Sequence, residues 1–99
     1  MISSKELQNK YIKMYEGLRE YIWPFETVKR LADLEVSVYT TFPSPEQVKK
    51  DFNALYLDIR DTLDEDEELK ESVEDFKETV ETLESETFYS KLNQVQEAI

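Results

Sequence analysis

The sequence predicts an all-α protein, a four- to five-helix antiparallel bundle that forms a single helical domain over residues 1–99. Apolar residues recur at steps of three and four along several stretches, the spacing that places side chains on one face of a helix. The 99 residues include only one glycine and three prolines. The chain therefore has little of the turn material that a sheet of many short strands would need. A chain of this length builds one domain with a modest core.

The first expected helix spans about residues 4–23. Ser3 and Glu6 have the spacing of a capping box, in which each side chain bonds to the backbone amide of the other. Gly17 lies inside the helix and is either a tolerated glycine or a point of close approach to another helix. The apolar row of this helix follows steps of 4, 3, 4, 3 and 4: Leu7, Tyr11, Met14, Leu18, Tyr21 and Phe25.

Residues 25–42 fit two patterns. Phe25, Val28, Leu31 and Val38 can share one face of a helix, whereas residues 34–42 alternate between apolar and polar as in a strand. No second segment offers an obvious strand to pair with, and an isolated strand leaves its backbone groups unsatisfied. We therefore expect a helix from 25 to about 39 with a frayed or extended end. Pro24 either kinks the chain or begins this helix.

A third helix is expected over about residues 45–62. Ser44 suits the N-cap, Pro45 the first helical position, and Gln47 completes a capping box. The apolar row of this helix has steps of 4, 3 and 4: Val48, Phe52, Leu55 and Ile59.

A fourth helix is expected over residues 66–84. Its apolar row is Leu69, Val73, Phe76, Val80 and Leu83. The register then slips to a second row, Phe88, Leu92, Val95 and Ile99. This slip predicts a break at Ser85, Glu86 and Thr87, followed by a short last helix over about 87–98.

The four rows predict a core made mainly of aliphatic side chains and two phenylalanines. The expected core residues are Leu7, Tyr11, Met14, Leu18, Ile22, Val28, Leu31, Val48, Phe52, Leu55, Ile59, Leu69, Val73, Phe76, Val80, Leu83 and Leu92.

The formal charge of the protein, −11, is concentrated in one quarter of its length. Residues 61–86 hold thirteen acidic and two basic side chains, whereas residues 1–60 hold nine of each. Five of the acids form a row on the side of the fourth helix opposite its apolar row, about 160° away at ~100° per residue. This row is called the acidic ridge: Glu67, Glu71, Glu74, Glu78 and Glu81. Asp75 broadens it.

The composition argues against catalysis and against a built metal site. The chain has no histidine and no cysteine, the commonest acid–base and nucleophilic residues of enzymes. We therefore expect no catalytic residues, no cofactor and no metal. Asp64, Asp66 and Glu68 match the first positions of a calcium loop. Leu69 and Asp75 stand where that loop needs glycine and glutamate, so helix capping explains these acids better.

Two surfaces are candidates for partner binding. The acidic ridge, with Asp75, is either a solvated outer face that keeps the protein soluble or a docking surface for a basic groove. The second candidate contains Tyr21 and Trp23, which belong either to a corner of the core or to a binding hot spot.

We expect a cytoplasmic, acidic, protein-binding protein, an inhibitor or regulator whose negative ridge occupies a basic surface on a larger partner. That surface could be one built for nucleic acid, as with nucleic-acid mimics that phages and mobile elements encode. Direct binding to nucleic acid or membrane is disfavoured by the net charge. The alternative is a structural, assembly or chaperone protein that oligomerises through aromatic helix faces, most simply as a homodimer. No residue motif selects a known family.

Overall fold

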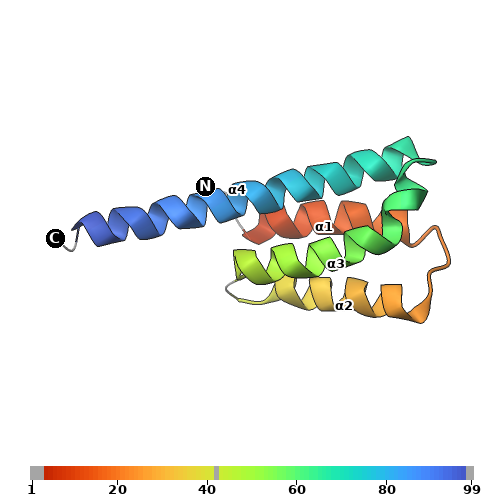
Figure 1. Ribbon diagram of the computed structural model, residues 1–99, viewed down its shortest axis with the longest axis horizontal. Helices are drawn as coiled ribbons and strands as arrows, with labels where there is room; N and C mark the ends of the chain where they lie inside the picture. The colour runs from red at the N-terminus through yellow and green to blue at the C-terminus, as the bar shows by residue number, and fades with distance from the viewer. Residues whose placement is uncertain (1–3, 42, 98–99) are drawn as a thin grey trace.

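The computed structural model describes residues 4–41 and 43–97, and their side chains as far as residue 83 (Figure 1). Within these ranges the protein is all-helical and contains no strand. The elements are α1 (Ser4–Leu18), α2 (Phe25–Tyr39), α3 (Pro45–Leu63) and α4 (Glu67–Glu97). The expected fold class is therefore confirmed at the level of a compact helical protein with four helices.

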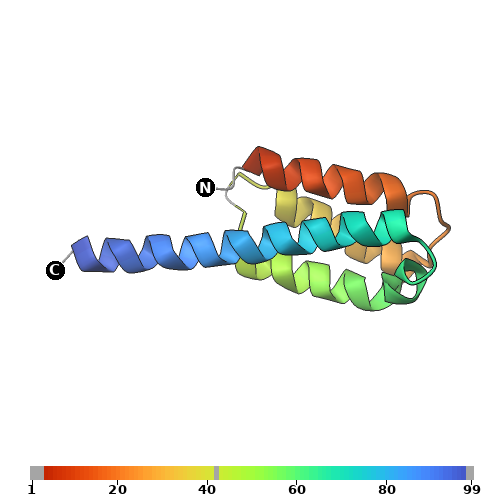
Figure 2. The same ribbon diagram turned by 90° about the horizontal axis from the view of Figure 1, so that it is seen from above.

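Successive helices run in opposite directions and pack side by side around one core (Figures 1 and 2). α1 contacts α2 and α4, and α3 also contacts α2 and α4, so the four helices stand at the corners of a square. One layer holds α1 and α2, and the other holds α4 and α3. The ribbon of α4 continues well past the ends of the other three helices, which gives the molecule extents of 53 × 24 × 21 Å.

The ambiguous segment, residues 25–42, forms a helix from Phe25 to Tyr39, as expected. Polar side chains of α2 contact carboxylates on α3, and one of them, Ser37, belongs to the alternating stretch. Thr27 Oγ1 donates to Asp58 Oδ2 at 3.1 Å, and Arg30 also contacts this carboxylate. Ser37 Oγ donates to the carboxylate of Asp51. Thr27, Arg30 and Ser37 therefore form a polar seam between α2 and α3.

The first helix ends at Leu18, earlier than the expected residue 23. The Leu18 carbonyl accepts from Trp23 Nε1 at 2.8 Å and from the Tyr21 backbone amide at 3.1 Å, so this group at the helix end is satisfied without a further helical turn. Pro24 stands directly before the first residue of α2, where its missing amide costs nothing. The chain thus turns between α1 and α2.

The predicted break at Ser85, Glu86 and Thr87 is wrong, because α4 is one continuous helix from Glu67 to Glu97. These three residues include neither proline nor glycine, the residues that usually interrupt a helix. A slip in the apolar row changes which face is apolar and does not stop backbone hydrogen bonding. The slip lies close to where α4 extends beyond the other helices (Figure 1).

Most of the expected core is buried. Two expected core residues are exposed instead: Ile22, in the turn after α1, and Val28, on α2. Leu31 and Leu83 are half-buried against the core, and Leu92 lies outside the described side chains. Three further residues complete the core: Leu34, Val38 and Leu63. In α2 the expected row was right at Val38 and wrong at Phe25 and Val28, which are exposed, while Leu34 faces inward with Val38.

Aromatic rings form the centre of the core. The ring centroids of Phe52 and Phe76 lie 5.3 Å apart, and those of Tyr11 and Phe76 lie 6.2 Å apart. Tyr11 is buried, and its hydroxyl donates to the carbonyl of Leu31 at 3.3 Å. Burial, aided by the nearby carboxylate of Glu35, raises the pKa of Tyr11 well above its ordinary value. This ring system joins α1, α3 and α4.

Gly17 marks a close approach between α1 and α4. A Cβ atom on Gly17 would lie 2.9 Å from Leu69 Cδ1, closer than real Cβ contacts allow. The close-approach interpretation of this glycine therefore fits the structure better than the tolerated-glycine one. The contact positions the first turns of α4, where the acidic ridge begins.

Candidate functional site

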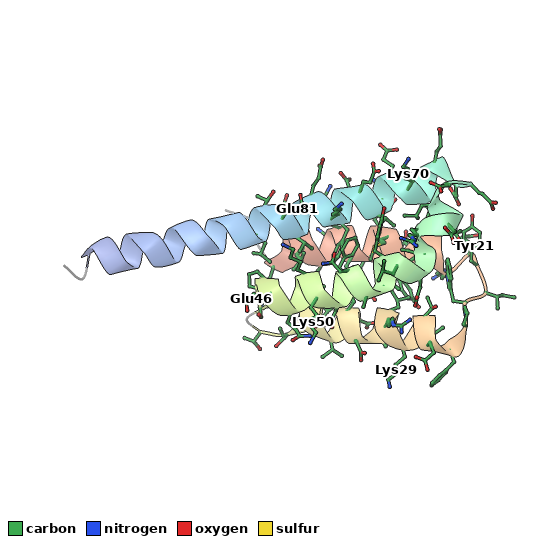
Figure 3. The ribbon with its side chains drawn as sticks, viewed as in Figure 1. Tyr21, Lys29, Glu46, Lys50, Lys70 and Glu81 are labelled. Atoms are coloured by element: carbon green, nitrogen blue, oxygen red, sulfur yellow. The ribbon has the colours of Figure 1, made fainter. Side chains whose placement is uncertain are left out.

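The acidic ridge lies on the outer side of α4. All five of its glutamates are exposed, whereas Leu69, Val73, Phe76 and Val80 of the same helix are buried. At 1.5 Å rise per residue, the ridge extends about 21 Å from Glu67 to Glu81 and presents a carboxylate about every 5 Å (Figure 3).

The side chains that the structure describes do not neutralise the ridge. Among the described side chains, no basic group lies within 4 Å of a ridge carboxylate. Lys77 has its Nζ 5.8 Å from the centroid of the Tyr56 ring on α3, so it is directed toward α3. Lys70 is exposed near the start of α4. Five like charges therefore face solvent together.

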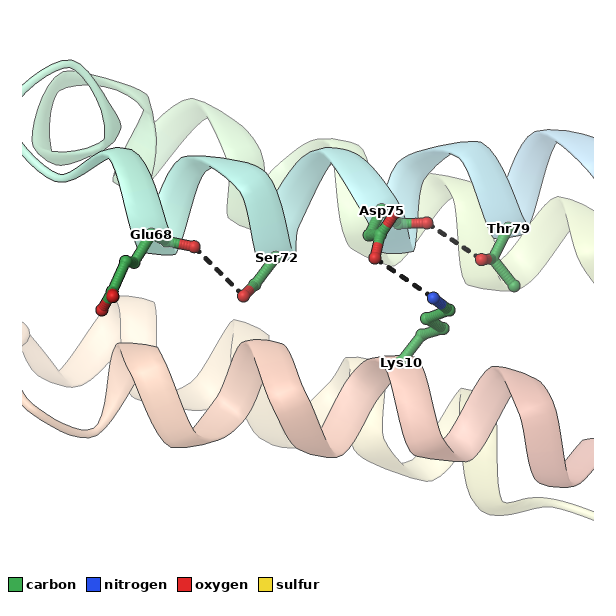
Figure 4. Close-up of polar contacts among 5 residues, drawn as sticks. All are labelled: Lys10, Glu68, Ser72, Asp75 and Thr79. Atoms are coloured by element: carbon green, nitrogen blue, oxygen red, sulfur yellow. Dashed lines mark hydrogen bonds and ion pairs between the residues drawn. The ribbon is translucent and has the colours of Figure 1, made fainter.

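Asp75 has a different role from the ridge. Lys10 Nζ on α1 lies 3.1 Å from Asp75 Oδ2, and both side chains are only partly exposed (Figure 4). The backbone carbonyl of Asp75 accepts a hydrogen bond from Thr79 Oγ1 at 2.9 Å. Asp75 thus lies on the side of α4 that faces α1 and helps to hold these two helices together.

A groove next to the ridge adds to the negative surface. It lies between α1 and α4 and has a volume of about 740 Å³. Four carboxylates and one basic side chain line it: Glu16, Glu20, Asp66, Glu68 and Lys13. The outer side of α4 and this groove together form a broad acidic surface.

Tyr21 and Trp23 anchor the turn between α1 and α2 to the bundle. The Tyr21 hydroxyl donates to Asp66 Oδ2 at 2.6 Å, while Asp66 Oδ1 accepts from the backbone amide of Leu69 at 3.1 Å. The hydrogen bond from Tyr21, with that amide, lowers the pKa of Asp66, and the same bond raises the pKa of Tyr21. Asp66 therefore has two roles: it caps the start of α4, and it holds the turn between α1 and α2.

Trp23 is half-buried, and its ring centroid lies 5.8 Å from that of Tyr21. Its indole N–H donates to the backbone carbonyl of Leu18, the last residue of α1. These contacts favour the core-corner interpretation of the aromatic pair. Tyr21 and Trp23 lie at the end of the bundle where α4 begins, and they do not extend the ridge.

A second groove lies between α1 and α2, and the site residues predicted from the sequence do not include the residues that line it. Its volume is about 340 Å³, and Tyr11 contributes to its lining. It is called the α1–α2 groove: Ile12, Tyr15 and Glu16 on α1, Arg19 just after α1, and Glu35 and Tyr39 on α2. Ile12, Tyr15 and Tyr39 are 42%, 39% and 44% exposed. In the sequence, Tyr15 stands beside the apolar row of the first helix and widens it, and this widening is the signal that could have indicated the groove.

Comparisons with known proteins identify no relative: no family model, no curated protein and no solved structure matches the chain. In the described part of the chain, no three acidic side chains are placed to hold a metal ion. No helix in that part has the length and apolarity to span a membrane. The function must therefore be argued from the surfaces of the protein itself.

Charge reversal on the ridge is expected to stabilise the fold. Glu71 has a like charge four residues away on each side, Glu67 and Asp75, and each such pair costs roughly 0.2–0.5 kcal/mol. Glu71→Lys removes both repulsions and creates two attractive pairs. It should raise the free energy of unfolding by about 1 kcal/mol at low salt. Urea denaturation of the two chains, at low and at high salt, measures the gain, which should shrink as salt increases.

A result of the opposite sign would show that Glu71 makes a favourable contact within the fold. The matched control is Glu71→Gln, which removes the two repulsions without adding a positive charge. Its gain in free energy of unfolding should be about half that of the lysine variant, because it removes the two repulsions but adds no attractive pair.

Proposed function

We propose that the protein is a binding protein that acts by docking its acidic ridge onto a basic surface of a partner protein, as an inhibitor or regulator. The observation that carries the proposal is the concentration of unneutralised charge on one exposed helix face. Residues 1–60 balance their charges, nine acidic against nine basic, and α4 does not. Solubility alone does not require this arrangement, since mixing lysines into α4 would avoid the repulsion between its glutamates.

The spacing of the ridge suits a surface that binds a phosphate backbone. Its carboxylates follow one another about every 5 Å along the axis, the same order as the 3.4 Å per phosphate of one nucleic-acid strand. A groove whose lysines and arginines neutralise successive phosphates could therefore pair with several ridge carboxylates. A partner that normally binds nucleic acid would be blocked in this way.

The acidic groove beside the ridge supports the same proposal. Asp66 and Glu68 line it from the start of α4, and Glu16 and Glu20 line it from α1. A long basic side chain from the partner could enter there and meet several carboxylates, while the rest of the partner surface rests on the ridge. Complementary charge of this kind fixes orientation and accelerates encounter.

The test compares two variants of equal net charge. One carries Glu71→Lys, Glu74→Lys and Glu78→Lys on the ridge. The other carries Asp33→Lys, Asp61→Lys and Asp64→Lys, which are exposed on α2, on α3 and after α3. Each reversal adds two charges, so both variants change from −11 to −5. A partner captured with the wild-type protein should bind the control variant and lose binding to the ridge variant.

The ridge proposal fails if the captured partner binds both variants equally, or if its contact surface is not basic. Equal weakening by both variants would indicate a general effect of net charge rather than a docking surface. Circular dichroism of the two variants establishes that each remains folded. The two variants carry the same number of charge reversals with the same sign. A difference in their binding can therefore come only from where on the molecule the reversals lie.

A second candidate function is self-association in a structural or assembly role. The exposed apolar residues favour it, because eight of the nine large ones among the described side chains lie on α1, on α2 or in the turn between them. None lies in the described part of α4. The apolar surface and the acidic ridge therefore occupy different sides of the molecule, and the two candidate functions use different residues.

A further inference from the structure

We infer that the outer face of α2 is the interface of a two-fold homodimer, in which the α2 helices of two copies pack against each other in opposite directions. The inference rests on the second candidate function, self-association, and names the surface that it uses. It involves none of the ridge residues, so it does not depend on the acidic docking proposed above.

Helix α2 has apolar residues on two opposite sides. Leu34 and Val38 face the core, and a second set, called the α2 stripe, faces away from the bundle. The α2 stripe lies within an arc of about 80° at ~100° per residue, and all of its residues are exposed: Phe25, Val28, Ala32, Val36 and Tyr39. Its most exposed members, Phe25 and Val36, are 79% and 72% exposed. A helix that is apolar on both sides is typical of one that is covered on both sides.

The α2 stripe is symmetric about its central residue. Relative to Ala32, the other four residues lie at positions −7, −4, +4 and +7. In an antiparallel pair, a two-fold axis that passes between the two Ala32 residues places Phe25 of each copy level with Tyr39 of the other. The same axis places Val28 of each copy level with Val36 of the other. An isologous interface requires this correspondence, in which residue i meets residue j and residue j meets residue i.

The side chains of the stripe also have sizes that suit crossing helices. Packed helices cross at an angle, so they are closest at one point and diverge on either side of it. Ala32, the smallest residue of the stripe, lies at that point, whereas Phe25 and Tyr39 lie at the two ends, where the gap is widest. Each end then holds one Phe25 ring and one Tyr39 ring, an aromatic pair that contributes beyond its buried area.

Two charged residues beside the stripe favour a second copy of this chain as the occupant. Lys29 and Asp33 lie on the same side of the stripe, both are exposed, and among the described side chains neither takes part in an ion pair. Lys29 projects from the outer side of α2 (Figure 3). In the antiparallel pair, Lys29 of one copy is only about 3 Å along the axis from the level of Asp33 of the other. The two-fold axis forms this ion pair twice.

The area of this interface corresponds to a weak but specific dimer. An aromatic side chain presents about 150–250 Å², so Phe25 and Tyr39, at 79% and 44% exposure, offer roughly 250 Å² per copy. The rest of the α2 stripe contributes a similar area, so two copies bury roughly 1,000 Å², the lower limit of specific interfaces. We therefore expect a Kd in the micromolar range.

The arrangement keeps the two acidic ridges apart. α4 lies at the corner of the square diagonal to α2, and among the described residues these two helices share no contact. The outer face of α2 is therefore the part of the bundle farthest from α4. With about 8–10 Å between neighbouring helices, the two α4 axes stand roughly 30–40 Å apart in the dimer. This separation exceeds the screening length of about 8 Å at physiological salt, so repulsion between the ridges does not oppose dimerisation.

Introduced cysteines test the position and direction of the two-fold axis, because the chain has none of its own. In Ala32→Cys the two sulfurs face each other across the axis, so mild oxidation should link most chains into a covalent dimer of twice the 11.8 kDa chain mass. In Val36→Cys the two sulfurs lie about 12 Å apart along the axis, because Val36 of one copy is level with Val28 of the other. A disulfide cannot span this distance, so V36C should dimerise without forming the covalent link.

Two further variants separate the interface from random collision and from folding. Lys50→Cys, exposed on α3 (Figure 3), measures cross-linking away from α2 and should give little covalent dimer. Ala32→Glu places two carboxylates against each other at the axis and should weaken dimerisation by about 100-fold or more in sedimentation equilibrium. Circular dichroism should show the wild-type helix content in all four variants, because each substituted residue is exposed.

In sedimentation at high micromolar concentration, the wild-type chain should have twice the mass of a single chain. A monomer at that concentration overturns this inference together with the second candidate function, and leaves a different protein as the occupant of the α2 stripe. A wild-type dimer that A32E does not weaken retains self-association but places it on another surface, which overturns this inference alone. Cross-linking of both A32C and V36C would indicate parallel helices, and equal cross-linking of A32C and K50C would indicate collision only. Both results contradict the inference.

Discussion

Replacing Phe76 with alanine is expected to lower the free energy of unfolding by about 3–5 kcal/mol. Phe76 is fully buried, with its ring against those of Phe52 and Tyr11. The substitution removes the most central ring of the core and leaves a cavity that three different helices line. Small domains have total free energies of unfolding of about 5–15 kcal/mol, so this single change removes a large part of the stability of the protein.

The matched control is Phe25→Ala, at the first position of α2. The Phe25 side chain is 79% exposed, so the same atoms are removed from water rather than from the core. Its effect should stay within about 0.5 kcal/mol. Urea or thermal denaturation followed by circular dichroism measures both variants. Similar stability losses for Phe76→Ala and Phe25→Ala would contradict the packing described here.

The association rate of the protein with its basic partner is expected to fall by about 10-fold or more as salt rises from about 50 to about 500 mM. The ridge glutamates are exposed, so they act over a distance before contact rather than in a buried interface. Screening shortens from about 14 Å to about 4 Å over this range, which removes most of that long-range attraction. The dissociation rate should change much less.

Surface-based binding kinetics with the captured partner measure both rates. For the variant with Glu71→Lys, Glu74→Lys and Glu78→Lys, any residual binding should have lost this salt dependence. The control variant, with reversals at Asp33, Asp61 and Asp64, should keep most of the salt dependence of binding. An association rate that is insensitive to salt in the wild-type protein would show that the ridge does not steer the encounter.

Local signals predicted α3 well. Ser44 and Pro45 begin the helix as expected, and the Ser44 side chain accepts from the Gln47 backbone amide. The Gln47 side chain donates to Asp51 Oδ1 instead of returning to Ser44, so half of the expected capping box forms. The row from Val48 to Ile59 is apolar on one face and buried as expected. Such features depend on residues within one turn of each other, so they can be recognised without knowing the rest of the fold.

Contacts made outside the individual helices explain where the sequence interpretation was wrong. The end of α1 depends on the contact of Trp23 with the Leu18 carbonyl, and the apolar row alone would have continued the helix to residue 23. In α2 Val38 faces inward as expected, but Leu34 joins it in place of Val28, and Thr27 and Ser37 contact carboxylates on α3. The α3 carboxylates are distant in sequence from the α2 residues that they contact, whereas Trp23 lies only five residues after Leu18 but outside α1.

For the candidate site, the sequence by itself determined the ridge. Helical periodicity requires that Glu67, Glu71, Glu74, Glu78 and Glu81 share one face opposite the apolar row, and their exposure follows once that row is buried. Only the tertiary structure decided that Asp75 belongs to the contact with Lys10 of α1 and that Tyr21 holds the cap of α4. The α1–α2 groove also exists only when two helices lie side by side. A single helix specifies the angle between its own side chains, whereas a groove or an ion pair between helices depends on packing that brings distant residues together.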